Sequence, residues 1–210
     1  MPVDLATLML FAAAGTILVL TPGPDMIYVL TRGIGQGKAA GIVSVFGILA
    51  GSLVHAGAVA LGLASLFAAS PLAYDILRYA GAAYLLWLAY KAVAAGNDDF
   101  VLATRAPAGQ RRIFVEALVT NVLNPKVSLF YLTFMPQFVD PARGPVWLQV
   151  LFLAAVLNVI TLAIKGPLAL AAGQVGGWLA ARPGVRRVQR WVLGTVFGAL
   201  ALRLAWPEKR

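Results

Sequence analysis

The sequence predicts an all-α, polytopic membrane protein whose six transmembrane helices form two inverted three-helix repeats. Hydrophobic residues make up 60% of the 210 positions, or 126 residues, whereas soluble domains usually have roughly 45–50%. A bilayer core of roughly 30 Å needs about 20 helical residues per crossing, so these residues suffice for about six helices. Proline also interrupts the first and fourth predicted helices, the leading helices of the two halves. We therefore expect one transmembrane domain, residues 1–210, without a sizeable soluble part.

Long uncharged stretches bounded by charges, prolines or glycines place the helices. The first, at about 4–30, has no basic region before it and no small-residue cleavage pattern after it, so we expect a retained helix and not a signal peptide. The others are expected at about 39–67, 72–93, 113–138, 146–172 and 191–206. The hydrophilic stretch 95–112 reads as a linker between a first half, residues 1–94, and a second half, residues 113–210.

Basic residues indicate the orientation, because Lys and Arg accumulate in cytoplasmic loops. The segments after the first, third and fifth helices carry ten of them, against four on the opposite side. We therefore expect a cytoplasmic linker and both termini outside; cysteine labels on opposite faces would favour five helices instead. Three helices per half insert the halves in opposite directions, as in many secondary transporters. The ten basic residues are Arg32, Lys38, Lys91, Arg105, Arg111, Arg112, Arg182, Arg186, Arg187 and Arg190.

The composition argues against several functional classes. Without cysteine there is no disulfide framework, thiolate metal site or dithiol chemistry, and a single histidine cannot build a multi-histidine metal centre, so we expect no metal and no cofactor. The net charge of +9 is explained by the cytoplasmic loops, and the basic stretches stand beside apolar helices, so no nucleic-acid partner is expected. A membrane enzyme would need a nucleophile with its base, or a metal cluster, and the sequence offers neither.

Two proline breaks are the main pointer to a functional site. Residues 21–25 read TPGPD and residues 120–126 read TNVLNPK. A proline inside a membrane helix frees backbone groups that are tolerated only against protein or a watery cavity, and paired breaks in corresponding helices mark transporter binding sites. The alternative for the first break is a simple kink, with Gly23 as cap, Pro24 as first helical residue and Asp25 stabilised by the positive helix end.

Lys126 is the residue that capping does not explain. It follows the Asn124-Pro125 start of a helix, where a positive charge opposes the helix dipole, so it should have an anionic partner. Asp25 is the economical candidate, since a charge at membrane depth is usually paired or functional. We expect a site for a zwitterionic amino acid, whose ammonium group faces Asp25 and whose carboxylate takes Lys126 and exposed N–H groups near Asn124.

Other polar residues leave alternatives open. On the fourth helix, Glu116 either contributes to a polar stripe or meets Arg111 or Arg112 near the cytoplasmic interface. The stripe itself, which faces a pore or contacts a helix, comprises Glu116, Thr120, Asn124 and Ser128. Lys165 either snorkels or pairs inward, and the sequence does not decide between the two.

The second helix presents small and polar residues on one side. Gly47 and Gly51 form a GxxxG pattern, which predicts close helix packing. His55, on the same face, is either a hydrogen-bonded buried residue or a proton carrier. We keep it as a secondary site candidate, together with the adjacent face position Ser52.

Four stretches of the sequence closely resemble the LysE/RhtB family of bacterial amino-acid exporters. They cover most of residues 1–140 in order, and the pair TPGPD and NPK is quite specific. The sequence departs from the family at Ser52, where many members have an acid or threonine. It also departs in the fifth helix, which often carries an acid and an aromatic-small pair where this sequence has Asn158 and Lys165-Gly166-Pro167. The stretches are TPGPDMIYVLTRGIGQGKAAG (21–41), GILAGSLVHAGAVALGL (47–63), RYAGAAYLLWLAYKA (78–92) and FVEALVTNVLNPKVSLFYLTFMPQFV (114–139).

The resemblance implies a multi-pass secondary exporter in the bacterial inner membrane, driven by protons. Its substrates would be amino acids such as lysine, arginine, threonine, homoserine or leucine, moved by alternating access around Asp25 and Lys126. Asp25 and His55 are the candidates for proton coupling, and a homo-oligomer is left open. The alternatives are an exporter of another small metabolite or cation, or a membrane protein without transport activity. The expected substrate-binding residues are Thr21, Pro22, Gly23, Pro24, Asp25, Asn121, Asn124, Pro125 and Lys126.

Overall fold

Proline and glycine determine where the first helices begin and end. Helix α1 (Leu5–Leu20) ends before Pro22, and α2 (Pro24–Gln36) begins with a proline at its first position, at an angle of 53° to α1. Gly37, with a φ of 86°, makes the turn into α3 (Lys38–Ala69). At the start of α1, the backbone N–H of Thr7 donates to Asp4, and this hydrogen bond is the main cause that holds the pKa of Asp4 below its ordinary value.

The computed structural model describes residues 2–69 and 107–174, and for residues 63–69 it describes the backbone only. It also describes the single positions Tyr79, Ala83, Leu86, Trp87, Tyr90, Trp191, Thr195, Gly198 and Leu202. The helices predicted at 72–93 and 191–206, and most of the linker predicted at 95–112, therefore lie outside the described residues.

The second broken helix consists of four helical segments of three kinds. Helix α5 (Gln110–Val122) is followed by the short α6 (Pro125–Leu129), a π-helical turn η1 (Phe130–Phe134) and a 3₁₀ turn η2 (Met135–Phe138). The bend between α5 and the segment that begins at Pro125 is 52°. A further 3₁₀ turn, η3 (Pro141–Arg143), leads into the long α7 (Val146–Leu170). The predicted breaks in both leading helices are confirmed.

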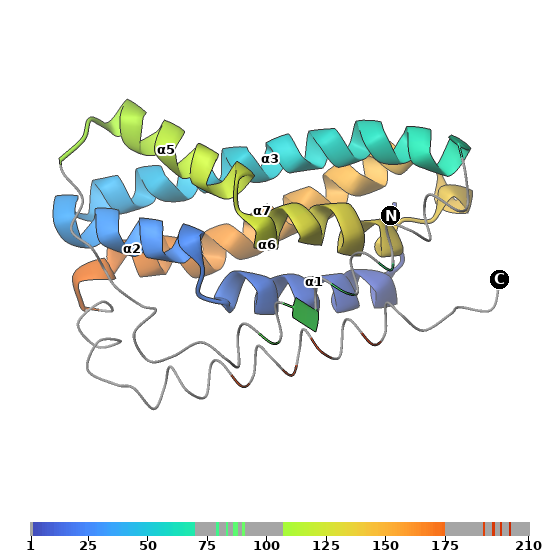
Figure 1. Ribbon diagram of the computed structural model, residues 1–210, viewed down its shortest axis with the longest axis horizontal. Helices are drawn as coiled ribbons and strands as arrows, with labels where there is room; N and C mark the ends of the chain where they lie inside the picture. Colours follow the sequence, from blue (N-terminus) through green and yellow to red (C-terminus); the bar gives the residue numbers. More distant parts are fainter. Residues whose placement is uncertain are drawn as a thin grey trace.

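The described elements form a bundle in which α3 and α7 are the long supports. Helix α3 packs against α5, α7 and α2, and α1 packs against α7. Figure 1 shows α2 and α5 toward one end of the bundle and α1 and the segment from α6 to η2 toward the other, so both helix breaks lie in its middle. This arrangement brings residues 20–25 and 121–126 to the same depth.

Two of the described helices are long and apolar enough to cross a membrane, Lys38–Gly62 within α3 and Val146–Leu170. Each bent pair, α1 with α2 and α5 with the segment to Phe138, passes the same test when taken as one broken span, so the described residues hold up to four spans. Most of the described residues are helical, and none of them forms a strand. The predicted first span at 4–30 is too short, because α2 continues to Gln36.

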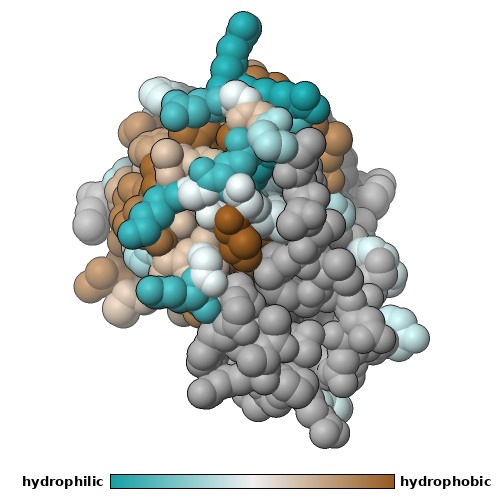
Figure 2. Space-filling model, turned by 90° about the vertical axis from the view of Figure 1, so that its left-hand side faces the viewer, coloured by the Kyte–Doolittle hydropathy of each residue, from teal (hydrophilic) through white to brown (hydrophobic). Residues whose placement is uncertain are grey.

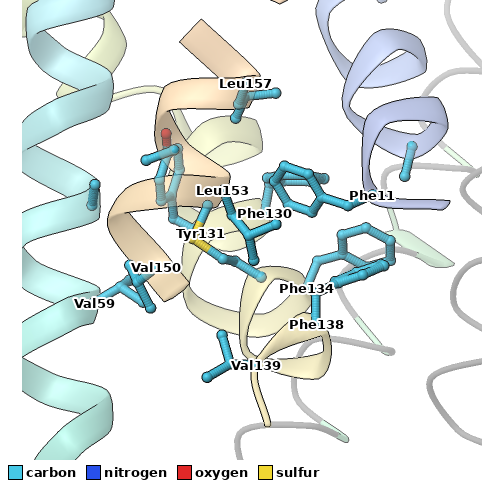
Figure 3. Close-up of a cluster of buried hydrophobic side chains, with 14 of the residues drawn as sticks. Phe11, Val59, Phe130, Tyr131, Phe134, Phe138, Val139, Val150, Leu153 and Leu157 are labelled. Atoms are coloured by element: carbon cyan, nitrogen blue, oxygen red, sulfur yellow. The ribbon is translucent and has the colours of Figure 1, made fainter. Parts of the chain in front are cut away.

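An aromatic cluster fills one end of the bundle. Phe11 of α1 lies 5.7 Å from the ring of Phe130 and 5.3 Å from that of Phe138, and Leu153 of α7 is fully buried beside them (Figure 3). A smaller cluster at the other end includes Val45, Ile48 and Ile113. The polar residues of the two breaks lie between these apolar layers.

The outer surface differs between the ends and the sides of the bundle. Large apolar side chains are exposed along the helices, with Leu61 79% and Val159 68% accessible. Hydrophilic side chains gather on the end where α2 meets α3 and α5 begins (Figure 2), where Lys38, Arg111 and Arg112 are exposed. This is the surface pattern of a helix bundle in a bilayer, apolar around the sides and charged at an end.

Candidate functional site

A buried carboxylate joins the two helix breaks. Asp25, in the first turn of α2, is 2% exposed. Asn121, in the last turn of α5, donates its side-chain amide to Asp25 Oδ2 over 2.8 Å, and Asn124 donates to Asp25 Oδ1 over 3.0 Å. The first broken helix therefore supplies the acceptor and the second supplies the donors. The structure brings together these three residues, which were predicted from opposite halves of the sequence.

Asn124 has two functions in this arrangement. It is the N-cap of α6, and its side-chain Oδ1 accepts a hydrogen bond from the backbone N–H of Lys126 over 3.1 Å. The backbone N–H groups of Val127 and Ser128 both bond to the backbone carbonyl of Asn124. The prediction that N–H groups near Asn124 are exposed to a substrate is therefore wrong, because these donors already form hydrogen bonds within the turn. The amide suits this position because its oxygen accepts from α6 while its nitrogen donates to Asp25.

Lys126 bonds to the end of α1. Its Nζ donates to the backbone carbonyls of Leu18, over 3.0 Å, and Thr21, over 2.9 Å. The last carbonyls of a helix lack intrahelical partners and attract a positive charge, and the break after Leu20 leaves such carbonyls buried at this depth. The prediction that Asp25 is the direct ionic partner of Lys126 is therefore wrong, although both side chains line one cavity.

The ionic partner of Asp25 is Lys165. Its Nζ lies 3.3 Å from Asp25 Oδ2, and its side chain is only 5% exposed. Lys165 lies five residues before the end of α7, so a third membrane-spanning helix enters the site. Of the two alternatives for Lys165, snorkelling and inward pairing, the structure shows the second.

The prolines and glycine of the first break occupy the positions expected of them. Thr21 is the C-cap of α1, and its hydroxyl donates to the carbonyl of Ile17 over 2.7 Å. Gly23 is the N-cap of α2 in extended backbone, and a Cβ there would lie 3.3 Å from Lys126 Nζ. Pro22 lies between them, and Pro24 and Pro125 each open a helix. These residues determine the backbone path at the breaks, and the charged groups at these breaks come from Asp25 and Lys126.

A small cavity of about 20 Å³ lies among these groups. Its volume is about that of one water molecule, so the site is closed in this conformation. The polar part of its lining consists of Asp25, Lys126, Lys165, Asn121, Ser52 and Thr161, and the apolar part of Leu18, Val19, Ile48, Val127 and Leu157. A larger ligand requires the surrounding helices to move apart, and the breaks supply places at which they can bend.

Two polar residues of α3, Ser52 and His55, and Tyr131 of η1 form a group that begins at the cavity. Ser52 lines the cavity and shares a 2.5 Å hydrogen bond with the hydroxyl of the fully buried Tyr131. The ring of His55 stacks on Tyr131, and its Nε2 lies 3.3 Å from the backbone carbonyl of Asn121. His55 therefore contacts the site through Asn121 and does not line the cavity, whereas Ser52 does.

Tyr131 and Thr161 were not predicted as site residues. Tyr131 stands in an apolar stretch of the fourth predicted helix, where a hydroxyl needs a partner because none is available in lipid. The need for a partner could therefore have identified Tyr131 from the sequence. Nothing in the local sequence distinguishes Thr161, which lines the cavity together with Lys165, four residues later on the same face of α7.

The predicted GxxxG packing is confirmed at α3 and α5. A Cβ at Gly47 would lie 2.3 Å from the carbonyl oxygen of Phe114, and one at Gly51 would lie 2.8 Å from both Cβ and Oδ1 of Asn121. The absence of side chains at these two positions lets α5 approach α3 closely enough to hold Asn121 beside Asp25. Gly51 thus positions a site residue by leaving space for it.

A second polar cluster lies at the charged end of the bundle. Glu116 accepts from Arg32 over 2.6 Å, from Arg112 over 2.7 Å and from the hydroxyl of Tyr28 over 3.1 Å. The expected contact between Glu116 and Arg112 is confirmed. The prediction that Arg32 belongs to a loop is wrong, because it lies within α2 with 3% of its surface exposed and also bonds to Gln36.

The remaining members of the polar stripe satisfy their own helix. The hydroxyl of Thr120 donates to the carbonyl of Glu116, and that of Ser128 donates to the carbonyl of Asn124. The structure also shows no group of three or more His, Asp or Glu side chains that would suit a metal ion, within the residues it describes.

Comparison with known proteins gives a consistent result. The family described as LysE type translocator matches residues 16–207. A leucine efflux protein of Salmonella choleraesuis is 30% identical over 191 residues, covering 90% of this chain and 89% of that protein. A leucine efflux protein of Klebsiella pneumoniae is 31% identical, with 93% and 92% covered, and a homoserine/homoserine lactone efflux protein of Salmonella typhimurium is 32% identical, with 93% and 94% covered. No solved structure matches the chain.

Proposed function

Because the chain belongs to the LysE type translocator family, we propose that it is a secondary active exporter of amino acids whose substrate binds where the two broken helices meet. The names of its relatives, leucine efflux and homoserine/homoserine lactone efflux proteins, support amino-acid efflux. The observation that carries the assignment of the site is the buried carboxylate of Asp25, held by amides from both sides of the second break. A buried acid at membrane depth that is shared between two broken helices is suited to bind a substrate ammonium group.

The binding site consists of residues 21–25 and the polar residues from Asn121 to Lys126. The substrate ammonium group takes Asp25 as its acceptor, and the positive charge of Lys126 favours the substrate carboxylate in the same cavity. Lys126 also ties the end of α1 to the start of α6 through its bonds to Leu18 and Thr21. Binding and helix movement are therefore coupled, because a substrate that attracts Lys126 weakens that tie.

Transport proceeds by alternating access of the two halves, residues 1–94 and 113–210, about the two breaks. Bends of 53° and 52° at equivalent places support a hinge in each half. The exposed Lys38, Arg111 and Arg112 support a cytoplasmic location for their end of the bundle, with both termini on the other side of the inner membrane.

Coupling to protons requires a titrating group near the substrate. Asp25 contacts the cavity directly, and His55 contacts the backbone of Asn121, which in turn bonds to Asp25. These two residues are therefore the candidates for carrying the coupled proton.

The test is counterflow of labelled amino acids in proteoliposomes, with and without a pH gradient. We expect exchange of neutral amino acids, loss of exchange in Asp25→Asn, and normal exchange in the matched control Asp140→Asn, whose carboxylate is exposed in the loop before η3. Exchange of no amino acid by the wild-type protein would overturn the function. Full exchange by both Asp25→Asn and Lys126→Ala would overturn the site.

The assignment of the proton carrier has its own readout. We expect His55→Gln to keep counterflow without a gradient but to lose stimulation by a pH gradient if His55 carries the proton. Unchanged stimulation in that variant assigns the role to Asp25.

A further inference from the structure

Lys165 has hydrogen-bond donors to spare inside the closed site. An ammonium group has three N–H donors, and the structure gives Lys165, in the described part of the chain, a single acceptor, Asp25 Oδ2 at 3.3 Å. That distance is long for a charge-assisted hydrogen bond, which is usually about 2.7–2.9 Å. Lys126 differs, since two backbone carbonyls at 2.9 and 3.0 Å hold it. Of the two lysines, Lys165 is the one that is loosely held and incompletely paired.

Two other side chains that line the cavity, Asp25 and Asn121, have unused acceptor capacity. The side-chain Oδ1 of Asn121 is buried and has no hydrogen-bond partner among the described residues. An ionised carboxylate has about four lone-pair sites, and Asp25 receives three donors, from Asn121, Asn124 and Lys165. A buried polar atom without a partner costs free energy until it finds one. The side chains that line this cavity therefore have spare acceptors, on Asp25 and Asn121, and spare donors, on Lys165.

This pattern matches the two charged ends of an α-amino acid. We infer that the substrate inserts between Asp25 and Lys165, with its ammonium group on Asp25 and Asn121 and its carboxylate on Lys165 as well as on Lys126, so that Lys165 selects neutral zwitterionic amino acids. This inference rests on the proposed function and assigns a substrate-binding role to a residue of α7. The ion pair of the closed site is replaced by two ion pairs to the substrate.

The charge and the apolar lining of the cavity determine which side chains it accepts. Two lysines and one aspartate line it, so its formal charge is +1 when all three side chains are ionised. A neutral zwitterion adds no net charge, whereas a lysine or arginine substrate adds a further positive charge in a low-dielectric site. Leu18, Ile48 and Leu157 provide an apolar wall for an uncharged side chain.

Substrate entry requires Lys165 to leave Asp25. The cavity of about 20 Å³ holds one water molecule and not an amino acid. Lysine has a flexible four-carbon side chain, so its ammonium group can withdraw toward α7 while Asn121 and Asn124 keep Asp25 in place. Lys126 is anchored to α1 and cannot withdraw without releasing that helix end.

The experiment uses leucine, leucinamide and lysine as competitors of labelled leucine in proteoliposomes. Leucinamide keeps the ammonium group and the side chain of leucine but lacks the carboxylate. We expect wild-type protein to bind leucine about tenfold to a hundredfold more tightly than leucinamide, which is the effect of one hydrogen-bonded charge. Lys165→Gln should weaken the binding of leucine by that factor and leave the binding of leucinamide unchanged. It should also reduce the ratio of the affinity for leucine to the affinity for lysine.

Two further variants separate binding from structure. Lys165→Arg keeps the charge and should keep the preference for leucine over leucinamide, and Lys38→Gln removes an exposed lysine and should behave as wild type. If Lys165→Gln does not fold, the wild-type comparison can still overturn the proposal. Equal inhibition of wild-type protein by leucine and leucinamide would overturn the role of Lys165 while leucine exchange itself upheld the proposed function. A wild-type protein that exchanges no amino acid would refute the proposed function instead.

Discussion

Replacing Gly47 by alanine tests how the close contact between α3 and α5 supports the fold. The added Cβ would lie 2.3 Å from the carbonyl oxygen of Phe114 and 2.6 Å from the Cβ of Ala117. Neither atom belongs to a flexible side chain, so the helices must separate. Restoring a contact of 3.4 Å requires movement of about 1 Å along the shorter vector.

The expected loss of stability follows from two opposing effects. Overpacking of a filled core costs about 1–3 kcal/mol, and a clash with backbone at 2.3 Å belongs at the upper end. Alanine in place of glycine in a helix stabilises by about 1 kcal/mol. Gly47→Ala should therefore lower the free energy of unfolding by about 2 kcal/mol.

Gly57→Ala is the matched control, because it lies in the same helix and a Cβ there meets nothing within 4 Å. It should keep the helix-forming gain and be unchanged or up to about 1 kcal/mol more stable. Reversible unfolding of both variants by SDS in mixed micelles measures the difference directly. Equal stabilities of the two variants would refute the close packing of α3 on α5.

Two other substitutions address the polar clusters. Glu116→Gln removes the carboxylate of Glu116 from the buried Arg32 and should cost about 3 kcal/mol in the same unfolding assay. Arg112→Gln, at a 74% exposed side chain, should cost at most about 1 kcal/mol. Equal losses in the two variants would contradict the cluster as described. Asn124→Asp keeps an N-cap for α6 but puts a carboxylate where Asp25 receives a donor. We expect its circular dichroism to stay helical while leucine exchange falls at least tenfold, and exchange at the wild-type rate would show that the donor is dispensable.

Features that depend on neighbouring residues in the sequence were predicted correctly. Prolines mark the helix breaks at 21–25 and 124–125 because their effect on the backbone is local. The pair Arg112 and Glu116 was expected because residues four apart share a helix face. Close packing at Gly47 follows equally from a local pattern.

Features that depend on which helix lies opposite were not predictable in the same way. Arg32 was assigned to a loop because it follows a long apolar stretch, but its partner Glu116 is 84 positions away and draws it into the bundle. The place of Lys165 depends on α7 passing beside the first break, and residues 140 positions apart meet there. The sequence shows that such a cation needs a partner, but not from which helix the partner comes.

The exchange of partners at the site has a specific physical cause. A broken membrane helix leaves two unsatisfied ends, donors where the chain restarts and carbonyls where it stops. The prediction for Lys126 considered only the positive end, where a cation is unfavourable, and therefore assigned it to Asp25. The carbonyls of Leu18 and Thr21 at the end of α1 are equally in need of partners, and Lys126 bonds to them. Asp25 is then left to a cation from another element, which is Lys165. Lys126, which follows the second break, thus stabilises the carbonyl end of the first. The ion pair with the buried Asp25 is then formed by Lys165, which is held more loosely and which a substrate can displace.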